Sequence, residues 1–312
     1  MSGSLYSGHS VGTASCVAGI AMDAELATGY QSEPYTFSYS SKDAILYNLA
    51  VGSSTLDQDS LRFLYEHHPL FAPLPTFGVL PGLAWLDTLV TGGVPGISVD
   101  LAKVLHGEQY MKVKKPLPAE GKLTNVFKIQ DILDKGRGMV LLVGVESKNE
   151  DGEVVLQNQV SLFIVGAGGW GGPRSSAHTI DIIKSPSRVP DASLEYQTSV
   201  DQAALYRMTG DLNPLHISPE AASLLGFQTP ILHGLCSLGI SVRQVMATFA
   251  GNDPARVCEM KVRMSKPVVP GQTLRTDMWL EDEEKVLFKT TVVETGEVCL
   301  DGGWVRIVKI TC

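Results

Sequence analysis

The stretch ILHGLCSLGISVRQVMATF, residues 231–249, carries one charged side chain and predicts a single long apolar helix. A helix that is apolar around most of its circumference is buried in the folded protein. The beginning of this stretch has a shorter counterpart earlier in the chain, where VLPGLAWL (79–86) lines up with ILHGLCSL (231–238). The sequence therefore predicts two buried helices in equivalent positions of a duplicated chain.

Two further matches occur in the same order and support the duplication. The segment DAILY (43–47) resembles DQAALY (201–206), and KPLPAEGKL (115–123) resembles KPVVPGQTL (266–274). Three ordered matches at similar spacing indicate an internal repeat.

Each half continues with segments that are typical of β-strands. MVLLVGVES (139–147) and KVLFKTTVVET (285–295) are rich in β-branched residues and partly alternate between apolar and polar positions. Runs of strands after a helix indicate an α+β fold in which the helix packs on one face of an antiparallel sheet. A long helix wrapped by such a sheet is the hot-dog arrangement, so the sequence predicts a double hot dog.

The irregular stretches divide the chain. Residues 1–34, rich in Ser, Gly and Ala, predict a poorly ordered or loosely docked tail. The two halves then span 35–165 and 191–312, and a linker spans 166–190. Within the linker, GAGGWG (166–171) matches the dinucleotide-binding pattern G-x-G-x-x-G, but no amphipathic helix follows it, as such a site requires. We interpret these glycines as part of the linker.

The composition argues against several classes of protein. The net charge is −8 and no run of Lys or Arg occurs, so we expect no nucleic-acid partner. No run of eighteen apolar residues predicts a membrane span. The five cysteines are widely spaced without metal-type pairs, so we expect no metal site and a reducing intracellular compartment. The absence of Lys and Arg before Lys42 argues against a signal peptide, and the last three residues are not a peroxisomal S-K-L signal.

A polar loop, TGDLNPLHISPE (209–220), occurs only in the second half. Pro214 favours an extended conformation at Asn213, and predicted helices on both sides would hold the loop rigidly. Asp211 as an ordinary turn residue and His216 as a half-buried histidine would also explain the pattern. A purely structural loop should recur in both halves, so its single occurrence favours catalysis by Asp211 and His216.

The predicted helix after this loop begins near His233 and Gly234. The first N–H groups of a helix have no intrahelical acceptor, and Gly234 has no side chain to block an approaching ligand. The N–H of Gly234 is therefore a candidate donor to a developing oxyanion.

The segment YRMTGDLNPLH (206–216), followed by PILHGL (230–235), resembles the hydratase-2 motif of the MaoC-like dehydratase family. The similarity extends from about Tyr35 to Val308. It includes three segments that resemble the hydratase region of peroxisomal multifunctional enzymes: LPTFG (74–78), KVLHGEQY (103–110) and LDKG (133–136). The resemblance implies a double hot-dog hydro-lyase of fatty-acid β-oxidation. This R-specific 2-enoyl-CoA hydratase would convert trans-2-enoyl-CoA to (3R)-3-hydroxyacyl-CoA without a cofactor, the CoA thioester being the substrate.

The resemblance also implies roles for individual residues. Asp211 and His216 would act on one water as an acid/base pair, Asn213 would orient them, and Glu66 would support them. The N–H of Gly234 would hold the thioester oxygen. The acyl-CoA would be contacted by His106, Gly107, Lys135, Leu212, Pro214, Leu215 and Met264.

The first half lacks the catalytic loop, and its predicted helix at 82–90 runs into TGGVP (91–95). We hypothesise that this shortened helix leaves room for long or branched acyl chains. The resemblance further implies a homodimer, residence in peroxisomes (otherwise the cytoplasm), and neighbouring dehydrogenase and sterol-carrier domains if the chain is a piece of a multifunctional enzyme. Two alternatives stay open: a hot-dog acyl-CoA thioesterase, and a non-catalytic acyl-CoA binding protein.

Overall fold

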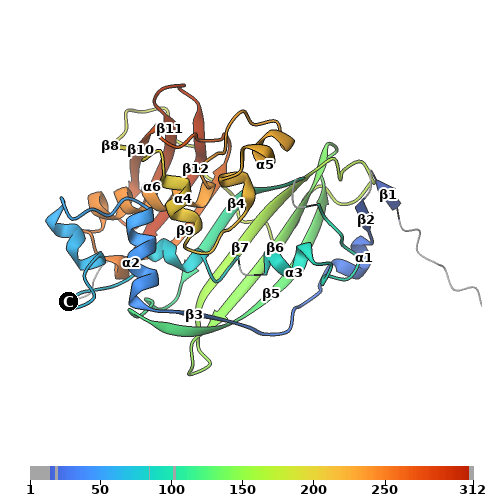
Figure 1. The fold of residues 1–312 in the computed structure, drawn as a ribbon, viewed down its shortest axis with the longest axis horizontal. Coiled ribbons are helices and arrows are strands. Elements are labelled where there is room, and N and C mark those ends of the chain that lie inside the picture. Colours follow the sequence, from blue (N-terminus) through green and yellow to red (C-terminus); the bar gives the residue numbers. More distant parts are fainter. Residues whose placement is uncertain (1–14, 18–19, 84, 101–102, 309–312) are drawn as a thin grey trace, which may run out of the picture.

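The computed structural model describes residues 15–17, 20–83, 85–100 and 103–308. Its main feature is a ten-stranded antiparallel sheet with the strand order β3-β5-β6-β7-β4-β9-β12-β11-β10-β8 (Figure 1). The first half contributes β3 (Tyr35–Tyr39), β4 (Val104–Val113), β5 (Gly121–Asp134), β6 (Gly138–Lys148) and β7 (Val154–Val165). The second half contributes β8 (Ala192–Gln197), β9 (Val257–Met264), β10 (Thr273–Asp282), β11 (Lys285–Val292) and β12 (Val298–Ile307).

The two halves meet at the seam between β4 and β9, where Tyr110 lies opposite Lys261 and Met111 lies opposite Met260. Outward from this seam, both halves present their strands in the same order, so the sheet repeats the duplication seen in the sequence. The predicted α+β double hot-dog fold is confirmed.

The long helix of the second half is α6 (Gly234–Phe249), which packs against β8 to β12. It begins at Gly234 rather than at Ile231, because Leu232 donates its N–H to the carbonyl of Val268 (2.7 Å). The equivalent helix of the first half, α3 (Leu86–Val90), has five residues and follows the 3₁₀ helix η2 (Pro75–Val79). The prediction of a long helix in each half is therefore wrong for the first half. The helix of the first half is short, as the TGGVP segment predicted. Gly92, the second residue after this helix, has a positive φ of 76°.

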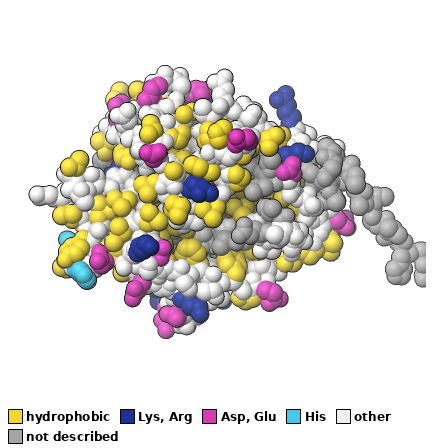
Figure 2. Space-filling view, in the orientation of Figure 1, with side chains coloured by type: hydrophobic (Ala, Val, Ile, Leu, Met, Phe, Trp, Pro, Cys, Tyr) yellow, Lys and Arg dark blue, Asp and Glu magenta, His cyan; other side chains and the backbone are white. Residues whose placement is uncertain are grey.

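The repeated tyrosines of the two halves lie side by side in the core. Tyr47 is on α2 (Ser41–Ala50) and Tyr206 is on α4 (Gln202–Arg207), and their ring centroids are 5.9 Å apart. The remaining elements are β1 (Ser15–Val17), β2 (Ile20–Met22), α1 (Ala24–Ala27), η1 (Gln58–Phe63), η4 (Pro214–His216), α5 (Pro219–Leu224) and η5 (Pro254–Arg256). Figure 2 shows hydrophobic side chains gathered over the middle of the face on which α2 and α4 lie.

The prediction of a loose tail over residues 1–34 needs correction at its C-terminal end. Ala27 is buried, and Gly29 and Ser32 donate their N–H groups to the carbonyls of Ile129 and Phe127 on β5 (2.8 and 3.0 Å). These hydrogen bonds join residues distant in sequence, which local composition does not reveal. Residues 1–14 and 18–19 lie outside the described residues.

The linker, residues 166–190, contains no helix, so its glycines do not form a dinucleotide site. Gly169 and Gly171 instead donate their N–H groups to the carboxylate of Asp134 (2.8 and 2.7 Å). Further along, the carbonyls of Asp181 and Arg188 accept hydrogen bonds from the indoles of two tryptophans, Trp304 and Trp279. The linker thus packs along the sheet.

Within the described part of the chain, no helix has the length and apolar character needed to cross a membrane.

Candidate active site

The loop between α4 and α5 is shaped by its own polar side chains. The carboxylate of Asp211 accepts the N–H of Asn213 (3.2 Å), and the amide oxygen of Asn213 accepts the N–H of Leu215 (3.0 Å), which starts the 3₁₀ turn η4. This turn places His216 on the inner side of the loop, where only 9% of it is exposed. Asp211 therefore does form a turn, and it also lines a cavity between the two halves.

A cavity of about 440 Å³ lies where the two halves meet. All loop residues from Gly210 to His216 line it, together with Gly234 and Met264. Its other wall belongs to the first half: Leu83, Leu86, Val104, Leu105, His106 and Leu162. The predicted residues Leu212, Pro214 and Leu215 therefore lie at one cavity with the predicted acid/base pair.

His216 is held in one tautomer by the backbone. Its Nδ1 lies 2.8 Å from the carbonyl of Ile231, and a carbonyl can only accept, so Nδ1 carries the proton. The lone pair of the neutral ring is then on Nε2. Burial lowers the pKa of His216 below its usual value, although the nearby charge of Asp211 opposes this change. The ring is therefore a neutral base at neutral pH.

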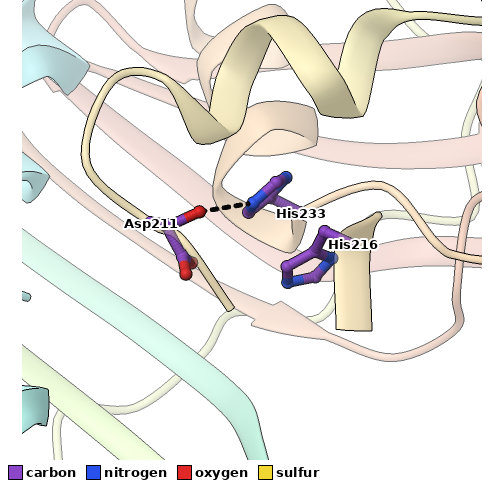
Figure 3. A group of neighbouring side chains, drawn as sticks. All are labelled: Asp211, His216 and His233. Atoms are coloured by element: carbon purple, nitrogen blue, oxygen red, sulfur yellow. Dashed lines mark hydrogen bonds between the residues drawn. The ribbon is translucent and has the colours of Figure 1, made fainter. Parts of the chain in front are cut away.

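A third side chain, His233, completes the group (Figure 3). Its Nε2 donates to the main-chain carbonyl of Asp211 (3.1 Å), and its ring stacks on that of His216 with a centroid distance of 3.6 Å and an interplanar angle of 27°. Burial, and then the neighbouring His216, lower the pKa of His233 to about 3. The residue pattern of the catalytic loop did not predict His233 as a site residue. One signal was present, because the first half has Pro81 at the equivalent repeat position.

Asp211, His216 and His233 also offer three possible metal ligands, with ligand atoms within 4.8 Å of one another. Two His and one carboxylate can bind a divalent transition metal. Here, however, the two imidazole rings are stacked with an interplanar angle of 27°, so lone pairs that lie in the ring planes do not readily converge on one metal ion. One nitrogen of each ring also donates a hydrogen bond to a main-chain carbonyl, so only the other nitrogen could bind a metal. The arrangement fits proton transfer to and from water better than metal binding.

Gly234 is the first residue of α6, so its N–H has no acceptor within the helix. The helix dipole adds partial positive charge at this end, which stabilises an anion. A Cβ at this position would lie 2.7 Å from Cγ of Met264, so the close packing of Met264 requires glycine. The N–H and the two predicted catalytic side chains line the same cavity.

The predicted acyl-CoA contacts fall on two adjoining cavities. His106 lines the first, with a buried Nε2 that has no partner among the described residues, and burial lowers its pKa to about 4. Gly107 and Lys135 line the second, a cavity of about 280 Å³ that also includes Arg263. Met264 lies between the two cavities and lines both.

Glu66 lies apart from these residues. It lines neither cavity, its side chain is 45% exposed, and its nearest ionic neighbour is His67 at 3.8 Å. The structure does not bring Glu66 together with Asp211 and His216, and its supporting role stays a prediction.

Both halves of the chain match known protein families. Residues 37–166 match the MFE-2 hydratase 2 N-terminal domain, and residues 181–301 match the MaoC like domain. The peroxisomal multifunctional enzyme type 2 of Drosophila melanogaster is 48% identical over 87% of this chain and 46% of its own length. The chain thus spans about half the length of that enzyme.

Two relatives are similar over nearly their whole length. A probable enoyl-CoA hydratase 2 of Dictyostelium discoideum is 38% identical over 90% of this chain and 95% of its own. The crystal structure of a MaoC-like dehydratase from Phytophthora capsici has a TM-score of 0.80 and 34% identity, covering 91% of this chain and 98% of that one. Family matches in both halves, together with these relatives, show that the chain belongs to the MaoC-like hydratase 2 family.

Proposed function

We propose that this chain is an R-specific 2-enoyl-CoA hydratase, which adds water to trans-2-enoyl-CoA and yields (3R)-3-hydroxyacyl-CoA in fatty-acid β-oxidation. The observation that carries the proposal is the meeting of Asp211, His216 and Gly234 at one cavity. Relatives named enoyl-CoA hydratase 2 support it. The R configuration follows from the family resemblance.

The proposed reaction uses one water held between the carboxylate of Asp211 and Nε2 of His216. The neutral Nε2 accepts a proton from the water while the oxygen of the water bonds to C3 of the substrate. The electron pair of the C2–C3 double bond moves toward the thioester, whose oxygen becomes an enolate. The N–H of Gly234 donates to this oxyanion. The imidazolium then returns the proton to C2, so one water has been added and both side chains are restored. These steps require no cofactor.

The two cavities suit the two parts of an acyl-CoA. Leucines of the first half form an apolar wall beside the catalytic loop, where burial of an acyl chain contributes about 0.8 kcal/mol per methylene. The short helix α3 contributes Leu86 to this wall. We place the anionic part of CoA at the second cavity, where Lys135 supplies a cation suited to phosphate. Non-catalytic accommodation of the acyl chain is thus the proposed role of the first half.

Incubation of the purified chain with trans-2-decenoyl-CoA distinguishes this proposal from its two alternatives. Loss of the conjugated enoyl absorbance without release of free thiol is the expected result, and chiral chromatography of the product should give the 3R isomer. Release of free thiol would indicate the thioesterase. Binding without any reaction would indicate the acyl-CoA carrier.

The cellular setting is part of the same proposal. The Drosophila relative and a 35% identical Arabidopsis thaliana relative are named peroxisomal, so we extend peroxisomal residence to this chain. Dehydrogenase and sterol-carrier domains would be its neighbours in a multifunctional enzyme. Homodimer formation stays a prediction that the molar mass in solution tests.

A further inference from the structure

His233 contacts all three parts of the candidate site. Its Nε2–H donates to the main-chain carbonyl of Asp211, and its ring stacks on His216. It also directly precedes Gly234, as the N-cap residue of α6. Only 1% of His233 is exposed, so the water at the cavity cannot reach most of its surface.

The repeat gives an independent reason to connect His233 with the reaction. ILHGLCSL and VLPGLAWL occupy equivalent positions, and both contain the glycine that follows His233 or Pro81. Proline has no N–H and no side-chain donor, so Pro81 cannot donate a hydrogen bond as the ring of His233 does. The histidine occurs only in the half that carries the Asp211 loop.

We propose that His233 is a positioning residue, whose neutral ring fixes the main chain of Asp211 and the plane of His216 for the hydration reaction. This inference rests on the proposed hydratase function. The hydrogen bond from Nε2 of His233 fixes the position of the Asp211 main chain at the cavity. The stacking of His233 on His216 prevents the His216 ring from turning its Nε2 away from the water. Both effects act through other residues, since His233 itself contacts no reacting atom in this mechanism.

The ring must stay neutral for this role. The charged and titratable groups around it are Asp211, His216, Arg207 and the aromatic neighbour Tyr206, whose ring centroid is 4.8 Å away. Among the described residues, none is a hydrogen-bond partner of Nδ1 of His233, as expected for the unprotonated nitrogen of a neutral ring. A second positive charge in the stack would repel the imidazolium that His216 becomes during turnover. The low pKa of His233 is consistent with a neutral ring.

Two variants separate the two contacts. His233→Gln keeps an N–H donor of similar reach and removes the ring, whereas His233→Phe keeps a stacking ring and removes the donor. Ser237→Ala is the matched control, because Ser237 is buried one turn further along α6 and its hydroxyl has no hydrogen-bond partner in the described part of the chain. The expected result is a roughly 10- to 100-fold loss of kcat in each His233 variant, with KM within about two-fold of the wild type. The control should keep the wild-type kcat.

Wild-type kcat in both His233 variants would overturn the proposal. A purely structural role would instead lower the melting temperature and the fraction of active protein, and leave kcat per active site unchanged. If neither variant folds, the imidazole ¹⁵N spectrum of the wild type still tests the proposal, because it reports the tautomer and charge of His233. His233 should show the neutral Nε2–H form from pH 5 to 8, and a cationic or Nδ1–H ring would contradict its role. Failure of the hydratase proposal is recognised separately, because the wild type itself would then be inactive on trans-2-decenoyl-CoA.

Discussion

Lys261 and Glu108 form an ion pair of 2.7 Å across the seam between the two halves, and the lysine side chain is completely buried. Burial lowers the pKa of Lys261, and the carboxylate of Glu108 opposes this change. Removal of one partner from a buried pair leaves an uncompensated charge in a site of low polarity. The seam therefore depends on both residues.

We expect Glu108→Gln to lower the free energy of unfolding by about 3–5 kcal/mol, measured by urea denaturation. The matched control is Glu153→Gln, which breaks the pair between Glu153 and Lys115, where both side chains are about half exposed. Solvent screens an exposed pair, so the control should leave the free energy of unfolding close to that of the wild type. Equal effects of the two substitutions would contradict the importance of the seam pair.

Asp211→Asn should reduce kcat on trans-2-decenoyl-CoA by roughly 100-fold or more, since the neutral amide loses the negative charge that holds and polarises the water for His216, and a disabled acid–base pair typically costs 10²- to 10⁴-fold. The amide keeps the size of the side chain and its acceptor oxygen for the N–H of Asn213, so the melting temperature should stay near that of the wild type. Asp201→Asn is the control, because Asp201 is exposed and makes no side-chain capping bond. Retention of the wild-type rate in Asp211→Asn would exclude the proposed mechanism.

The dependence of kcat/KM on pH follows from the lowered pKa of His216. The neutral ring is the active form, and it persists as the pH falls until the pH approaches that lowered pKa. Activity should therefore be retained at pH 6.5, the usual pKa of histidine, and fall only at more acidic pH. The pH profile of kcat/KM, measured where the protein stays folded, checks this expectation. An acidic decline centred above pH 6.5 would be inconsistent with it.

Gly234→Ala should lower kcat/KM at least about tenfold, because the new Cβ would lie 2.7 Å from Cγ of Met264 and displace the wall beside the oxyanion donor. The backbone itself would tolerate alanine, which favours helix formation. The double variant Gly234→Ala/Met264→Ala should recover part of the loss, since the shortened side chain removes the clash. Absence of any recovery would mean that the effect does not arise from this contact.

Leu86→Trp should discriminate between substrates of different chain length. Leu86 lines the apolar wall that the first half contributes, so a larger side chain there would reduce the space for the acyl chain. We expect kcat/KM for trans-2-decenoyl-CoA to fall by about tenfold or more while crotonyl-CoA is converted at close to the wild-type rate. Equal losses on both substrates would contradict the role of this wall in accommodating long chains.

The sequence by itself determined the repeat, the strand-rich halves and the polar loop that occurs only once. Periodicity and turn chemistry act over short distances, so the segments of β6, β11 and α6 were recognisable from their own residues. The single occurrence of Asp211 and His216 in a duplicated chain likewise predicted that the second half is the catalytic one. The break after Val90 also predicted the short helix of the first half.

The tertiary structure alone decided which distant residues meet. The hydrogen bond from His233 to Asp211, the wall that His106 and Leu86 supply from the other half, and the docking of Ala27 each join segments far apart in the chain. It also placed Glu66 outside the cavities. Such contacts depend on how sheets and helices pack around a shared core, and a local pattern of polar and apolar residues does not encode them.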